Sequence, residues 1–122
     1  MSRQKILIVD DERIISDSLA VILEKAGYQT RAVYSAEQAI ETIGEWTPDL
    51  AILDVVLPSM TGIDLAILLK SSHPTIAVML ISGQIATGGL IEKASQLGHQ
   101  FDVHSKPVPI PELLAHATQL LA

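Results

Sequence analysis

A few charged and hydroxyl side chains in the sequence stand directly at the ends of apolar runs. Asp10 and Asp11 follow one run, Asp54 and Ser82 end two others, and Lys106 follows a fourth. Carboxylates that lie close together raise one another's pKa unless a cation sits among them. Oxygen ligands without Cys or His favour a hard cation such as Mg²⁺, which usually takes one or two carboxylates together with waters, carbonyls and phosphate oxygens. A carboxylate beside Mg²⁺, a lysine and a hydroxyl donor is equipped for phosphoryl transfer, because positioning and charge neutralisation supply most of that catalysis.

Whether these side chains meet depends on the elements that carry them. Short aliphatic runs predict five strands at residues 5–9, 28–33, 50–53, 76–81 and 101–105. Three of them, KILIV, LAIL and IAVMLI, are apolar at nearly every position, which is typical of strands buried on both faces of a parallel sheet.

Helical periodicity alternates with these runs. The patterns cover residues 15–26, 35–43, 63–69, 90–97 and 111–121. Ser35 with Gln38 predicts a capping box, and glycines at positions 27, 44 and 98 are the expected helix stops. Pro111 suits the first turn of the last helix.

The alternation of strand and helix predicts the fold class. Five strand–helix units with right-handed crossovers give an α/β, doubly wound parallel sheet with helices on both faces, and residues 1–122 are expected to form one domain. Ligands of such sheets bind outside the carboxyl ends of the strands. Each polar residue at those ends has an ordinary explanation by itself, as a helix cap or a turn, but four such features at four strand ends indicate a single site.

Composition narrows the class further. The chain has 122 residues, is 48% hydrophobic and 18% charged, and contains no cysteine, which excludes disulfides, thiolate metal sites and thiol catalysis. A net charge of −6 and four Phe, Trp and Tyr residues in all argue against direct binding to nucleic acid. The apolar runs are too short to span a bilayer, so we expect a cytoplasmic protein without a membrane partner.

Four segments together resemble one known family. They are ILIVDDE at 6–12, DLAILDVVLPSMTGIDL at 49–65, VMLISG at 78–83 and SKPV at 105–108. In order and spacing they are similar to the response-regulator receiver domains of two-component phosphorelays, and the resemblance covers about residues 4–121. It implies a flavodoxin-like sheet of strand order 2-1-3-4-5 with five helices.

The resemblance also implies roles for the polar residues. Asp54 would be the phosphoacceptor, Ser82 would hydrogen-bond the phosphoryl group, and Lys106 would pair with it. The implied Mg²⁺ ligands are Asp10 (through water), Asp11, Asp54 and the backbone carbonyl of Val56. Pro58 and Gly62 match the turn after the acceptor, and Lys106–Pro107 is a candidate cis peptide bond.

The same resemblance implies partners rather than an enzyme with its own substrate. A sensor histidine kinase or a histidine phosphotransfer protein would supply the phosphoryl group. An output domain or a second copy would bind the face formed by the fourth helix, fifth strand and fifth helix.

The chain departs from the family pattern near the expected switch. Val103 stands where receivers usually carry Tyr or Phe, Phe101 is one residue pair earlier, and Gly83 replaces a frequent alanine. The segment from Gly98 to Lys106 is one residue longer than is common. We therefore expect Ser82 to act mainly on the glycine-containing segment 83–91.

Two other classes share parts of this pattern. A haloacid-dehalogenase-like phosphatase also uses aspartate, lysine, a hydroxyl and Mg²⁺, but its nucleophile belongs to a DxD motif on the first strand. A flavin-binding electron carrier needs a phosphate-binding loop after that strand, where this chain has Asp10-Asp11-Glu12. The four histidines, at positions 73, 99, 104 and 116, lack metal-ligand spacing and are expected to be structural, as are Trp46 and Met60.

Overall fold

The computed structural model describes residues 3–83, 92, 96, 98, 101 and 103–122. Its centre is a five-stranded parallel sheet in the order β2-β1-β3-β4-β5. The strands are β1 (Lys5–Val9), β2 (Gln29–Val33), β3 (Leu50–Asp54), β4 (Ala77–Ser82) and β5 (Val103–Ser105). The predicted fold class and strand order are both confirmed.

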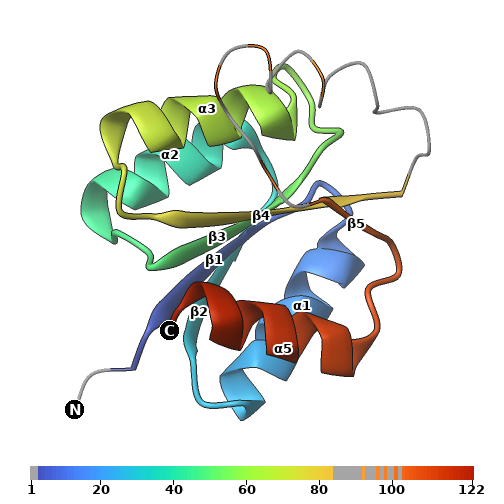
Figure 1. The fold of residues 1–122 in the computed structure, drawn as a ribbon. Helices are drawn as coiled ribbons and strands as arrows, with labels where there is room; N and C mark the ends of the chain where they lie inside the picture. The colour runs from blue at the N-terminus through green and yellow to red at the C-terminus, as the bar shows by residue number, and fades with distance from the viewer. Residues whose placement is uncertain (1–2, 84–91, 93–95, 97, 99–100, 102) are drawn as a thin grey trace.

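Two layers of helices cover the sheet (Figure 1). The helices described are α1 (Arg13–Lys25), α2 (Ala36–Glu45), α3 (Gly62–Ser72) and α5 (Ile110–Leu120). Helices α2 and α3 lie on one face, and α1 and α5 lie on the other. Of the predicted fourth helix, the structure describes only Glu92 and Gln96, both helical, whereas Leu90, Ile91, Ala94 and Leu97 fall outside the described residues.

The sheet divides the apolar core in two, because side chains alternate between the faces of a strand. Leu7 and Val9 of β1 pack with α2 and α3, whereas Ile6 and Ile8 pack with α1 and α5. Strands β1, β3 and β4 are buried along almost their whole length, as their continuous apolar sequences predicted.

The described helix ends follow most of the sequence signals. Ser35 Oγ accepts from the Gln38 backbone amide, but the Gln38 side chain accepts from the amide of Tyr34 and not from that of Ser35, so the predicted capping box is only half formed. Gly27 ends the α1 region with a φ of 107°. The expectation that Gly44 stops α2 is wrong: the helix includes Gly44 and ends at Glu45. A glycine stop requires a left-handed backbone, which Gly44 does not adopt.

Trp46 caps the core at the amino end of the sheet, as its position in the sequence predicted. Its side chain is buried, and the Lys5 and Arg31 cations lie 5.7 and 5.1 Å from its ring centroid. No helix in the described ranges is long and apolar enough to cross a membrane.

Candidate functional site

The carboxyl ends of four strands bring the predicted polar residues to one edge of the sheet. The register pairs Val9 with Leu53, Asp54 with Ile81, and Ser82 with Ser105, so these strand ends are level. Asp10 therefore emerges beside Asp54, and Lys106 emerges beside Ser82.

The Lys106 ammonium lies at the centre of this group. Its Nζ is 2.6 Å from Asp10 Oδ2, 2.9 Å from Asp54 Oδ2 and 3.3 Å from Glu12 Oε1. The backbone amide of Lys106 also donates to the Ser82 carbonyl, at 2.8 Å, which fixes the start of the side chain beside β4. Lys106–Pro107 is a cis peptide bond, as predicted.

Asp10 is fully buried and holds the floor of the site. Its Oδ1 accepts from the Glu12 backbone amide at 2.9 Å, an arrangement that starts the turn into α1. Its Oδ2 makes the ion pair with Lys106, at 2.6 Å. The buried negative charge of Asp10 thus depends on a nearby cation for its stabilisation.

Asp54 is 4% exposed, and both of its oxygens are engaged. Oδ1 accepts from the Val56 backbone amide at 3.2 Å, and Oδ2 accepts from Lys106. Burial raises the pKa of Asp54, and the negative charge of Asp10 adds to the effect, although Lys106 and Val56 oppose it. Three carboxylates, those of Asp10, Glu12 and Asp54, thus surround the single Lys106 ammonium.

Lys106 remains a cation in this environment. Burial by itself would lower its pKa, but the interactions with Asp10 and Asp54 outweigh burial and raise the pKa above the ordinary value. The side chain is a permanent positive charge beside the Asp54 carboxylate.

A pocket of about 400 Å³ opens over Asp54. Its lining residues are Asp11, Glu12, Asp54, Val56, Gly83 and Lys106. Carboxylate oxygens of Asp10, Glu12 and Asp54 lie within 4.8 Å of one another. This all-oxygen set of acidic ligands fits a hard divalent cation. Asp11 lines the exposed rim of the pocket, and its direct metal contact stays a prediction.

Sequence reasoning overlooked Glu12 in this group. Its side chain reaches back over the pocket to Lys106, a contact that depends on side-chain conformation and not on strand position. The acidic triplet 10–12 was a visible signal, but residues ahead of a helix also serve commonly as caps and first-turn anions.

The turn after Asp54 is tightly packed against the end of β3. The Gly62 amide donates to the Val55 carbonyl at 2.8 Å, and a Cβ on Gly62 would lie 2.0 Å from the Asp54 carbonyl oxygen. Ser59 has a φ of 69°, and the Met60 amide donates to the Pro58 carbonyl across it, which makes a strained γ-turn.

The remaining predicted residues lie behind the pocket. Ser82 is buried at the end of β4. Val103 and Phe101 both pack against the core on the α2–α3 side, so Phe101 has the predicted strand parity. The segment expected to respond to Ser82, residues 83–91, lies outside the described part of the chain apart from Gly83.

The fold and this site together define a class of protein: a flavodoxin-like α/β domain with an acidic pocket and one lysine at the carboxyl edge of its sheet. The sequence matches the response regulator receiver domain family over residues 6–118, and the chain belongs to that family. It is therefore a receiver domain of two-component signalling.

Relatives and solved structures agree with this membership. The DNA-binding response regulator MtrA of Mycobacterium tuberculosis is 37% identical over 78 residues, 64% of this chain and 34% of that protein. The phosphate regulon transcriptional regulatory protein PhoB of Pseudomonas aeruginosa is 42% identical over 81 residues, 66% of this chain and 35% of that protein. The matches thus span about a third of each of these relatives.

Two crystal structures match nearly the whole chain. A CheY-like response regulator receiver domain protein from Methanospirillum hungatei superposes with a TM-score of 0.88 at 28% identity, covering 98% of this chain and 94% of that one. The receiver domain of NtrX from Brucella abortus gives a TM-score of 0.82 at 33% identity, covering 95% and 97%.

Proposed function

We propose that the chain receives a phosphoryl group on Asp54 from a phosphohistidine, with Mg²⁺ as cofactor, and passes the signal on by changing a binding surface. The observation that carries the proposal is the buried Asp54 carboxylate, held in place by the Val56 amide and the Lys106 ammonium beneath an open acidic pocket. A carboxylate fixed in this way is a positioned nucleophile.

The transfer forms one bond and breaks another. A lone pair of the Asp54 carboxylate attacks the phosphorus of a phosphohistidine, an O–P bond forms, and the P–N electron pair leaves with the donor imidazole. The leaving imidazole is neutral because its other ring nitrogen carries a proton. Lys106, already 2.9 Å from Asp54, then lies where it can pair with the phosphoryl oxygens. Ser82 is proposed to hydrogen-bond them as well.

The cation has a defined place in this scheme. The groups that would hold the Mg²⁺ ion are Asp10, Asp11, Glu12, Asp54 and the Val56 backbone carbonyl. When bound, Mg²⁺ supplies positive charge that neutralises the phosphoryl oxygens and the crowded carboxylates. The three carboxylates of Asp10, Glu12 and Asp54 around one ammonium favour such a cation electrostatically.

A direct test uses a small phosphodonor. Incubation with acetyl phosphate and Mg²⁺ should add one phosphoryl group, measured by intact mass, and chelation should prevent the addition. Asp54→Asn should abolish it, whereas Asp64→Asn, which removes an exposed carboxylate from the first turn of α3, should not. Equal modification of Asp54→Asn and wild type would refute the assignment.

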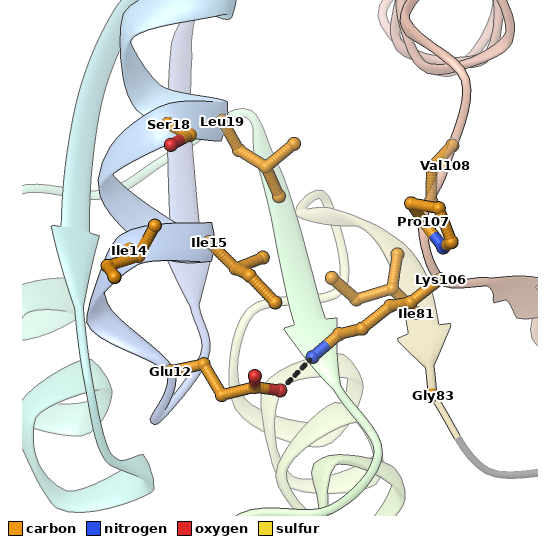
Figure 2. Close-up of a pocket in the computed structure, with 10 residues that line it drawn as sticks. All are labelled: Glu12, Ile14, Ile15, Ser18, Leu19, Ile81, Gly83, Lys106, Pro107 and Val108. Carbon is orange, nitrogen blue, oxygen red and sulfur yellow. Dashed lines mark hydrogen bonds and ion pairs between the residues drawn. The ribbon is translucent and has the colours of Figure 1, made fainter.

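The donor needs a docking surface beside the pocket, because a phosphohistidine must reach a nearly buried carboxylate. A groove of about 420 Å³ lies between the first turns of α1 and the segment that follows β5, and we propose it as that surface. Figure 2 shows the residues that line it. Glu12, Gly83 and Lys106 line both the groove and the acidic pocket, so the two are continuous. Ile14 stands at its edge with 83% of its surface exposed. An apolar side chain so exposed beside a charged pocket suits a helical phosphodonor partner.

Partner docking and phosphoacceptor chemistry can be separated. Ile14→Asp should slow phosphotransfer from a histidine kinase that phosphorylates the wild type, by about 10-fold or more for a central contact, yet leave labelling by acetyl phosphate unchanged. Ile40→Asp is the matched control, because Ile40 is an exposed isoleucine on α2, in the opposite layer. Equal transfer rates for the two variants would exclude this groove.

We further propose that the domain signals from the cytoplasm and serves as a phosphoacceptor, not as an enzyme that turns over a separate substrate. The signal would leave through the face formed by β5, α5 and the predicted fourth helix, to an output domain or a second copy. MtrA is a DNA-binding regulator by name, but the acidic charge of this chain argues that it would not itself contact DNA.

A further inference from the structure

Three side chains with metal-binding atoms meet on the α5 side of the sheet, away from the acidic pocket. His104 lies in β5, and Glu112 and His116 lie on α5. The two α5 residues are four positions apart and therefore share one face of the helix. Ligand atoms of all three residues lie within 4.8 Å of one another.

The contacts among these side chains leave one buried polar atom without a hydrogen bond. His104 Nδ1 is 3.7 Å from Glu112 Oε1, which is too long for a hydrogen bond. His104 Nε2 is buried and has no hydrogen-bond partner among the residues described. The His104 and His116 rings lie 4.2 Å apart between centroids at an angle of 60°, so they touch without stacking in parallel.

Because His104 is largely buried, the missing hydrogen bond of its Nε2 indicates room for a ligand. The His104 side chain is only 11% exposed, and a buried polar atom without a hydrogen-bond partner destabilises the fold. The Glu112 side chain is 46% exposed, so the cluster opens to solvent on one side. An ion could enter there and meet an imidazole that is otherwise uncompensated.

The ligand chemistry differs from that of the acidic pocket. Two imidazoles and one carboxylate form a set that binds late first-row divalent ions, and His₂Glu with an open fourth position is an established zinc arrangement. With metal–ligand bonds of about 2.0–2.1 Å, tetrahedral ligand atoms stand roughly 3.3 Å apart. The observed separations are close enough that side-chain rotation can complete such a site.

We propose that His104, Glu112 and His116 form a second metal site, which takes Zn²⁺ or a similar ion and leaves one position for water. The site would tie β5 to α5, two elements of the proposed output face. The expectation that all four histidines are only structural missed this cluster, because β5 and α5 meet through the fold and not through a sequence motif.

The first test follows the individual histidines of the intact protein. Mg²⁺ is kept in excess to occupy the acidic pocket, and Zn²⁺ is titrated while ring ¹⁵N shifts are recorded. The rings of His104 and His116 should shift together and saturate at one equivalent, and His73 should not move. Zn²⁺-dependent shifts that spare His104 and His116 would overturn the proposal.

The second test measures affinity by calorimetry under the same conditions. His104→Gln and His116→Gln should each weaken Zn²⁺ binding at least 10-fold, because even indirect supports of a metal site contribute about that much. His73→Gln is the matched control, since His73 caps α3 and contacts Ser72 instead of the cluster. Unchanged affinity in both cluster variants would also overturn the proposal.

Discussion

Gly62 offers a sharp test of how the end of β3, which carries Asp54, is held. The residue opens α3 and lies directly against the end of β3. In Gly62→Ala the added Cβ would stand 2.0 Å from the Asp54 carbonyl oxygen, 2.7 Å from the Asp54 carbonyl carbon and 3.0 Å from Val55 Cα. All three atoms are backbone, so no side chain can rotate out of the way.

The size of the effect follows from these distances. Side-chain Cβ atoms do not approach other heavy atoms closer than 3.0 Å, so the helix start and the strand end must separate by about 1 Å. Overpacking of this kind costs typically 1–3 kcal/mol, and we expect about 2 kcal/mol for Gly62→Ala. For a domain of this size the melting temperature should fall by roughly 6–10 °C.

Gly44→Ala is the matched control. Gly44 lies within α2, and a Cβ there would meet nothing within 4 Å. Replacing a helical glycine by alanine stabilises by roughly 0.5–1 kcal/mol. Because both variants lose the same glycine freedom in the unfolded chain, the difference between them isolates the clash.

Urea unfolding of the two variants provides the measurement, and labelling by acetyl phosphate provides a second. The free energies of unfolding should differ by about 3 kcal/mol between the variants. The labelling rate of Gly62→Ala should fall on the order of 10- to 100-fold, because a shift of about 1 Å misplaces the nucleophile. If the two variants unfold within about 1 kcal/mol of each other, the tight approach of α3 to Asp54 is not as described here.

Three further predictions concern charge and fluorescence. Because burial raises the pKa of Asp54, its ionisation weakens the metal-free fold as pH rises above the ordinary value of 3.8. Asp54→Asn should therefore raise the metal-free melting temperature at pH 7, measured by calorimetry. The hydrogen bond that Tyr34 donates to Asp17 raises the pKa of Tyr34. In a Tyr28→Phe background, the ultraviolet titration of Tyr34 should therefore lie above pH 10.0, and Asp17→Asn should lower that titration. The bond stabilises the fold below pH 10, and this stabilisation is lost as pH rises through the raised pKa of Tyr34. Trp46 lies at the opposite end of the sheet from Asp54, about 13 Å away along β3 alone, so Mg²⁺ should leave its fluorescence unchanged, and strong quenching would contradict this layout.

The parallel sheet and the edge that carries the site could be predicted because short local runs of sequence specify them. Runs such as KILIV and LAIL specify buried parallel strands, and the carboxyl ends of such strands share one edge. The meeting of Asp54 with Lys106 follows from that rule without any knowledge of side-chain conformation.

What the sequence did not reveal depends on tertiary contacts. The reach of Glu12 to Lys106 depends on a rotamer, and the approach of His104 to His116 depends on how α5 crosses β5. Gly44 was misjudged because glycine permits a helix to stop but does not require it.

Because the sheet divides the core, residues of one helical layer can change in evolution independently of residues of the other layer. Side chains packed with α1 and α5 do not share a cluster with those packed with α2 and α3, and effects of substitutions without common partners usually add. A lineage can therefore alter the layer that carries the groove beside α1 and the histidine cluster without compensating changes in the layer that presses Gly62 against Asp54. The proposed partner contacts can diverge while the Asp54 carboxylate keeps its position.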